Sequence, residues 1–280
     1  MGCCESGDRH SETRFLPNYR EKRFSRSKSA APFQSHWQHF TQVRDQKDIP
    51  GLVDFIRAPE RALISLPQTS EWIPPVSIGG HAISALAELC RTRGPEVAQA
   101  LSNDLHEVVQ NLCASPDLQD CSLVLLFYLS PALNSPLLDR LVNVNVYEGL
   151  CGVMKIGSKL RRQTAAETAR IVYEGSEERK RAFIRCDGIP VLLHVLNMDR
   201  DEKDYIHNSL VRLYDLLLVT STQDDQNQLI PSHRGALLEA RVLESVSTLD
   251  VAGLSGATVE LLDKLTWLLQ CDSWSVSEDS

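Results

Sequence analysis

Apolar residues recur along most of the chain at intervals of three and four, the spacing of helices that bury one face. Five segments rich in Leu and Ala have this spacing: Ala82–Leu89, Cys121–Leu129, Ala165–Val172, Leu210–Leu217 and Val259–Leu265. Their starts are 39, 44, 45 and 49 residues apart, close to the period of stacked helical repeats. The pattern predicts an all-α fold, a right-handed α-solenoid. The alternative is a non-repetitive helical bundle, which would not need this spacing.

One repeat unit can be read in detail. It contains three predicted helices, at Leu160–Tyr173, Glu177–Arg185 and Val191–Leu196. Gly175 ends the first helix, and Ser176 is placed to cap the second. We expect Gly188 to end the second helix in a left-handed conformation, and Pro190 to lie in the first turn of the third helix, where its missing N–H costs nothing.

This unit resembles an armadillo repeat, and the Gly188-Ile189-Pro190 turn followed by a Leu/Val-rich helix carries the resemblance. The resemblance implies a concave groove, lined by the third helix of each unit, that binds extended peptides or partner helices. Armadillo proteins often clamp the peptide backbone with Asn in that helix, whereas this chain has Arg170. Glu88 and Asp215 fall near comparable positions. They indicate either a charged groove or plain solvated helix faces.

The rest of the chain divides by composition. Residues 1–34 form a predicted disordered tail, 35–78 short helices and a Pro-rich connector, 79–272 the repeat domain, and 273–280 a disordered acidic end. Within the second segment we expect helices at Ser35–Gln46, near Ile49–Ile56 and after Pro59, and a loop at Leu66–Ile78 because of its prolines. Ser221–Gly235 is predicted to be a long loop.

The amino end fits a lipidation motif. Gly2 follows Met1, and Ser6 stands where the myristoylation pattern has a hydroxyl. One myristoyl chain binds a bilayer with only about 10⁴ M⁻¹, so stable attachment needs a second signal. Palmitoylation of Cys3 and Cys4 would supply it. The alternative is an accidental match in a solvated linker.

Charge along the chain is asymmetric. Residues 1–30 hold seven basic and four acidic residues, a balance of +3, and the formal net charge of −8 then leaves −11 for the remainder. The basic tail residues expected to attract anionic lipids are Arg14, Arg20, Lys22, Arg23, Arg26 and Lys28. An acidic body excludes a chain-wide nucleic-acid surface.

Motifs for catalysis are absent from the sequence. No phosphate-binding loop, dinucleotide fingerprint, nucleophile elbow or HExxH pattern occurs. The closest histidines, His36 and His39, lack a third ligand, and the scattered cysteines indicate a reducing compartment. We therefore expect no catalytic residues, no metal and no cofactor.

A lipidated tail followed by armadillo units resembles the vacuolar and apicomplexan membrane-anchored armadillo proteins. The resemblance implies a scaffold or adaptor on the cytoplasmic face of the plasma membrane or an endomembrane, where it recruits protein partners. The alternative function is a helical regulator of the small-GTPase-binding or formin-like kind, with the Ser221–Gly235 loop as a candidate functional insertion. The sequence does not indicate the oligomeric state.

Overall fold

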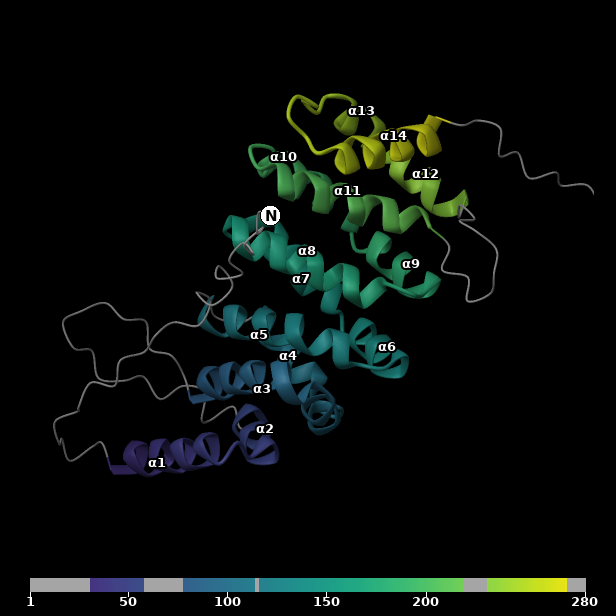
Figure 1. The fold of residues 1–280 in the computed structure, drawn as a ribbon. Coiled ribbons are helices and arrows are strands. Elements are labelled where there is room, and N and C mark those ends of the chain that lie inside the picture. Colours follow the sequence, from purple (N-terminus) through teal and green to yellow (C-terminus); the bar gives the residue numbers. More distant parts are fainter. Residues whose placement is uncertain (1–30, 58–77, 114–115, 219–230, 271–280) are drawn as a thin grey trace, which may run out of the picture.

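A computed structural model describes residues 31–57, 78–113, 116–218 and 231–270, and their regular structure is helical (Figure 1). The helices are α1 (Ala31–Asp45), α2 (Ile49–Arg57), α3 (Ile78–Leu101), α4 (Leu105–Leu112), α5 (Pro116–Leu129), α6 (Ser135–Asn143), α7 (Val146–Ile156), α8 (Lys159–Tyr173), α9 (Glu177–Arg185), α10 (Gly188–Met198), α11 (Lys203–Leu217), α12 (Pro231–Glu239), α13 (Val242–Ser247) and α14 (Gly256–Gln270). A short 3₁₀ turn, Ser130–Ala132, follows α5.

These helices group into five successive three-helix units. Arg93 has non-helical φ and ψ angles of −132° and 34° and divides α3 into two parts. The first part is the third helix of unit one, and the second part is the first helix of unit two. The units are α1, α2 and early α3; late α3, α4 and α5; α6, α7 and α8; α9, α10 and α11; and α12, α13 and α14.

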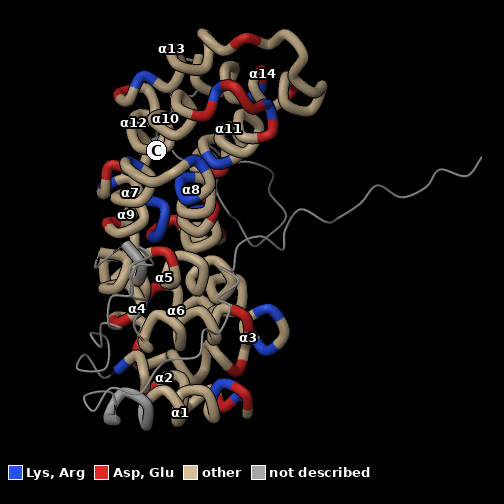
Figure 2. The backbone as a smooth tube through the Cα atoms, turned by 90° about the vertical axis from the view of Figure 1, so that its left-hand side faces the viewer, with Lys and Arg blue, Asp and Glu red and all other residues tan. Residues whose placement is uncertain are grey.

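The units stack into a solenoid. Third helices pack on one another in the order α3, α5, α8, α11, α14, and second helices α4, α7 and α10 do the same. Figure 2 shows α3, α8, α11 and α14 along one side of the column and α4, α7 and α10 along the other. All five Leu/Ala-rich segments predicted from the sequence lie in third helices, which confirms the all-α solenoid. The single unit read from the sequence, α8 to α10, instead joins the third helix of one unit to the first two helices of the next.

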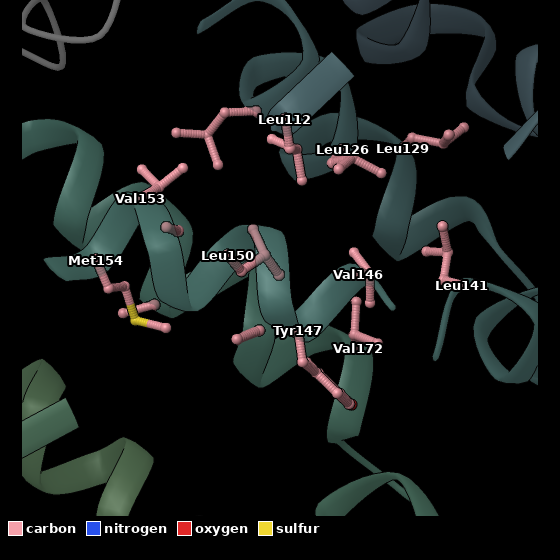
Figure 3. Close-up of a cluster of buried hydrophobic side chains, with 14 of the residues drawn as sticks. Leu112, Leu126, Leu129, Leu141, Val146, Tyr147, Leu150, Val153, Met154 and Val172 are labelled. Atoms are coloured by element: carbon pink, nitrogen blue, oxygen red, sulfur yellow. The ribbon is translucent and has the colours of Figure 1, made fainter. Parts of the chain in front are cut away.

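One hydrophobic core runs through the stack from Phe40 to Leu269. Figure 3 shows a section of it, where Leu112 of α4, Leu126 of α5, Tyr147 and Leu150 of α7 and Val172 of α8 are drawn. These five side chains are almost completely buried. Because burial of one such apolar side chain contributes roughly 1.5–3 kcal/mol, neighbouring units depend on their shared core for stability.

A backbone feature recurs where the first helix of a unit meets the second. Within the described residues, the non-glycine residues with positive φ are Lys47, Asn145, Asp187 and Arg241, with φ of 53°, 64°, 60° and 58°. Each lies immediately or two residues before a second helix. The left-handed conformation costs a non-glycine residue roughly 1–2 kcal/mol, so packing on both sides must hold these junctions in place.

Gly188 therefore does not have the expected role. The left-handed residue at that junction is Asp187, and Gly188 is the first residue of α10 with an ordinary φ. Its lack of a side chain serves packing: a Cβ there would lie 2.5 Å from Cε1 of Phe183. The other expectations for this unit are confirmed, since Gly175 has φ of 72°, Ser176 Oγ accepts a hydrogen bond from the Arg179 N–H at 3.3 Å, and Pro190 lies in the first turn of α10.

The repeat array begins earlier than the predicted boundary at residue 79. Helices α1 and α2 pack on α3 and contribute Phe40 and Leu52 to the same core. Helix α1 starts at Ala31 instead of Ser35, and Pro231–Gly235, predicted as loop, belongs to α12. The predicted helix after Pro59, most of the Pro-rich connector, residues 1–30 of the tail and the acidic end lie outside the described residues. Residues 31–34, predicted as the end of the disordered tail, belong to α1.

Candidate functional site

The third helices of the five units together present one continuous surface, which we call the third-helix face. It consists of the outward, part-exposed residues of the first part of α3 and of α5, α8, α11 and α14. The residues of this face considered below are Glu88, Arg91, Phe127, Tyr128, Glu167, Arg170, Asp215 and Trp267. Each unit contributes one helix to this face, so the kinds of side chain exposed on it change from one unit to the next.

Aromatic side chains lie at two places on this face, on α5 and on α14. On α5, the rings of Phe127 and Tyr128 lie 5.2 Å apart, and the guanidinium carbon of Arg91 lies 5.7 Å from the Tyr128 ring centroid. On α14, Trp267 is 57% exposed. Aromatic residues and arginine dominate the binding energy of protein interfaces, so these positions are suited to holding a polypeptide.

The centre of the face, between α8 and α11, is an internally paired polar cluster. Arg212 is buried and donates hydrogen bonds to Oε1 of Gln163 at 2.8 Å and Oε2 of Glu167 at 3.3 Å. Gln163 in turn donates to Oδ2 of Asp199 at 2.7 Å, and Tyr173 donates its hydroxyl to the Arg212 carbonyl at 3.0 Å. A buried charge paired in this way fixes the relative position of the two units.

Arg170 and Asp215 are brought together on this face, as their predicted positions implied. Nη1 of Arg170 lies 3.5 Å from Oδ2 of Asp215, and its Nε donates to Glu167 at 2.9 Å. Burial raises the pKa of Asp215 above its ordinary value, and the charge of Arg170 opposes the rise. Glu88, the third predicted residue, is exposed on α3, outside this cluster. The charges of Arg170 and Asp215 thus partly neutralise each other.

Polar contacts also join the other neighbouring third helices. Ser84 Oγ lies 3.2 Å from Cys121 Sγ between α3 and α5, and Arg161 pairs with Asp120 between α5 and α8. His207 Nδ1 lies 3.0 Å from Thr258 Oγ1 between α11 and α14. None of these contacts could be assigned from the sequence, because the side of each helix that meets its neighbour depends on a rotation accumulated over more than 35 residues.

The described residues hold no cluster of three or more His, Cys, Asp or Glu that could bind a metal ion. The side chain of His36 lies outside what the structure describes, and the His39 ring lies 5.5 Å from that of Phe55. Two open hollows occur away from the third-helix face, one beside α9 and one between α7 and the α9–α10 junction. In the described part of the chain, no helix is long and apolar enough to cross a bilayer.

The predicted lipidation residues Gly2, Cys3 and Cys4 lie outside the described residues. The same holds for the basic tail residues Arg14, Arg20, Lys22, Arg23, Arg26 and Lys28. The repeat residues Gly188, Ile189 and Pro190 lie at the start of α10, the second helix of its unit, and are therefore not part of the third-helix face.

Comparison with known proteins identifies armadillo solenoids by structure. No family model matches the chain, and no curated protein matches its sequence. The armadillo repeats only protein of Plasmodium falciparum has a similar structure, with a TM-score of 0.67 and 18% identity over 83% of this chain and 96% of its own.

Two further solved structures are similar. A designed armadillo repeat protein in complex with the peptide (KR)4 has a TM-score of 0.59 and 13% identity, covering 82% of this chain and 84% of its own. The structure described as showing a phosphorylation switch between cadherin and beta-catenin has a TM-score of 0.63 and 16% identity, covering 91% of this chain and 45% of that chain. At such identities the likeness establishes the armadillo-type fold.

Proposed function

We propose that this protein is a non-catalytic scaffold, fastened to the cytoplasmic face of a membrane by acyl chains on Gly2, Cys3 and Cys4, that recruits a protein partner on its third-helix face. The single observation that carries the proposal is the coupling of an N-terminal lipidation motif to an armadillo-type solenoid in one chain. Tethering both molecules to one surface raises their effective concentration without any chemistry on a substrate.

The anchor part of the proposal is supported by three features of residues 1–30. Gly2 offers the myristoylation acceptor, Cys3 and Cys4 offer thiols for a second acylation, and the basic residues add attraction to anionic lipids. A single acyl chain holds a protein only marginally, so the second acylation is the step that makes attachment stable.

The recruitment part is supported by the third-helix face. Its buried charges satisfy one another, so the groups left for a partner are the aromatic residues Phe127, Tyr128 and Trp267 and the outer edges of the ion pairs. Of the similar solved structures, one is by its description a designed armadillo repeat protein in complex with a peptide, and the description of another concerns the interaction between cadherin and beta-catenin. A partner polypeptide in an extended or helical form fits such a surface.

The anchor is tested by subcellular fractionation. Gly2→Ala removes the glycine whose amine accepts the myristoyl group. Because the thiols are then no longer held at the bilayer, the substitution prevents the second acylation as well. We expect that variant to move to the soluble fraction, and Cys3→Ser with Cys4→Ser to bind membranes weakly. Gly7→Ala is the matched control and should fractionate like the parent. A Gly2→Ala variant that stays with the membrane would contradict the anchor.

Recruitment is tested by quantitative proximity labelling. Trp267→Ala removes an exposed ring at little cost in stability, and Tyr128→Ala removes the ring beneath Arg91. We expect either substitution to deplete a defined set of labelled proteins while membrane attachment is unchanged. Gly152→Ala on α7, where a new Cβ meets nothing within 4 Å, is the control. Identical labelling by all variants would exclude the third-helix face as the recruitment surface.

A further inference from the structure

Exposed apolar side chains gather at one edge of the solenoid. In the described residues the exposed large hydrophobic residues are Ile156, Leu160, Met198, Val251 and Trp267. All except Trp267 lie where a second helix turns into a third: Ile156 ends α7, Leu160 is in the first turn of α8, Met198 ends α10, and Val251 lies between α13 and α14. Ile156 is the most exposed of them, at 83%.

The three turns lie side by side. Lys159, at the start of α8, pairs with Glu202 in the next turn, and Gln163 reaches Asp199 of that turn at 2.7 Å. Arg200 Nη2 lies 3.2 Å from Thr248 Oγ1 in the turn after it. In Figure 1 these turns form the left-hand edge of units three to five. We call residues 155–162, 198–204 and 248–254 the turn edge.

Local charge differs along the turn edge. Residues 198–204 and 248–254 together hold two basic and five acidic side chains. In unit three the segment 155–162 has four basic residues, Lys155, Lys159, Arg161 and Arg162, and no acidic residue. The most exposed apolar side chain of the edge, Ile156, is therefore the one with the most basic neighbours along the chain.

The chain enters the described structure from the same edge. Helix α1 begins at Ala31 on the left-hand side of Figure 1, the side on which α8, α11 and α14 also begin. The 30 residues before it can span at most about 100 Å when extended. A tail attached to a bilayer would thus join the body on the side that carries the exposed apolar residues, and it is long enough to let that side reach the bilayer.

We propose that the unit-three part of the turn edge is a second, non-covalent membrane contact, in which Ile156 and Leu160 enter the headgroup region of an anionic bilayer and Lys155 lies among the lipid phosphates. The orientation rests on the proposed acyl anchor, but the contact itself does not require acylation. Interfacial binding strengthens with buried apolar area and with attraction to anionic lipids, and lysine stems can lie along the apolar surface while their charges stay in water.

A flat occupant fits this edge better than a protein partner. Neighbouring units of packed helices are about 8–10 Å apart, so the apolar side chains form a row of single projections on turns. A bilayer can accept each such projection separately, without a pocket that encloses it.

The test uses the full chain with Gly2→Ala, so that no acyl chain contributes, and measures co-sedimentation with vesicles of phosphatidylcholine and phosphatidylserine. The combined substitution Ile156→Asp and Leu160→Asp should weaken binding about tenfold, since it replaces two apolar contacts by charges that anionic lipids repel. Ile156→Trp should bind at least as tightly as the parent, because Trp favours the bilayer interface. Gly235→Asp on α12, where a new Cβ meets nothing within 4 Å, is the control and should leave vesicle binding unchanged.

The membrane contact would be contradicted by equal vesicle binding of the parent and the double Asp variant, or by no vesicle binding of the parent. Loss of a labelled partner with unchanged vesicle binding would mark the edge as a protein surface and would also overturn the proposal. Circular dichroism melting of each variant shows whether a loss of vesicle binding reflects unfolding. If the double Asp variant unfolds, Ile156→Trp still tests the contact, because weaker vesicle binding by this variant would contradict it. Failure of the acyl anchor would appear separately, as unmodified Gly2 in a protein whose vesicle binding depends on Ile156.

Discussion

Gly188 offers the sharpest test of how the repeat units pack. A Cβ at this position would lie 2.5 Å from Cε1 and 2.6 Å from Cδ1 and Cζ of Phe183, whereas carbon atoms in contact are about 3.5–4.0 Å apart. Relief of the overlap in Gly188→Ala requires a shift of about 1 Å. The Phe183 ring is completely buried and held between the rings of Tyr147 and Tyr173, each at a centroid distance of 5.2 Å.

The expected cost follows from these contacts. Overpacking a well-filled core costs typically about 1–3 kcal/mol, and the better helix propensity of Ala returns at most about 1 kcal/mol. We expect Gly188→Ala to lower the free energy of unfolding by about 2 kcal/mol, which corresponds to a melting temperature lower by roughly 4–8 °C for a body of this size. Gly152→Ala, in open space on α7, should raise stability by about 0.5–1 kcal/mol.

The assay is urea unfolding followed by circular dichroism. In the Phe183→Leu background, where the ring is gone, Gly188→Ala should cost less than in the parent, with a coupling free energy of at least about 0.5 kcal/mol. Equal stability of the Gly188→Ala and Gly152→Ala variants would refute the reasoning, because helix propensity alone would then explain both.

Three further predictions concern charge and backbone. Arg241→Gly should raise the free energy of unfolding by about 0.5–1 kcal/mol, because it relieves the backbone strain of a non-glycine residue at a φ of 58°. The substitution loses only an exposed ion pair with Glu244 at 3.7 Å. A lower urea midpoint would count against strain at this junction. Arg212→Ala should cost about 3–5 kcal/mol by leaving buried partners unpaired, and a loss below 1 kcal/mol in the same assay would show that the polar cluster is not needed. The hydrogen bond and charge of Arg57 lower the pKa of Asp104 below its usual 3.8, so the stability that the pair contributes is present above pH 3.8 and is lost as the pH falls through the lowered pKa. The difference in free energy of unfolding between the parent and Asp104→Asn should therefore shrink between pH 6 and pH 3. A constant difference would contradict the ion pair.

Sequence patterns predicted the parts of the fold that depend on local chemistry. The third helices follow from Leu and Ala at helical spacing, and the ends at Gly175 and Ser176 follow from the backbone freedom of glycine and the hydroxyl of serine. Each of these signals is contained within one helix and its caps, so no knowledge of neighbouring units is needed.

The first unit was missed because its signals conflict. Helix α2 contains Pro50 and Gly51, both poor helix formers, so its place in the array depends on packing against α3. A usable signal was present: Ile49-Pro50 repeats Ile189-Pro190, and each pair follows a left-handed residue, Lys47 or Asp187, by two positions. In a sequence, neither Lys nor Asp indicates a left-handed conformation in the way that glycine does.

The candidate site was predicted only in part for a related reason. Arg170 and Asp215 stand at comparable positions of consecutive third helices, which is enough to expect them near each other. The pairing of Arg212 with Gln163 spans 49 residues and depends on how far α11 is rotated against α8. That rotation is set by the packing of whole units, and no short motif records it.

The central claim is that acyl chains hold this solenoid at a membrane, and mass spectrometry of the N-terminal peptide from protein purified out of its own cells tests it most directly. The account predicts a myristoyl amide on Gly2 and a hydroxylamine-sensitive thioester on Cys3, Cys4 or both. An N-terminal peptide with a free amine or an unmodified Met1, and with both thiols unesterified, would contradict it.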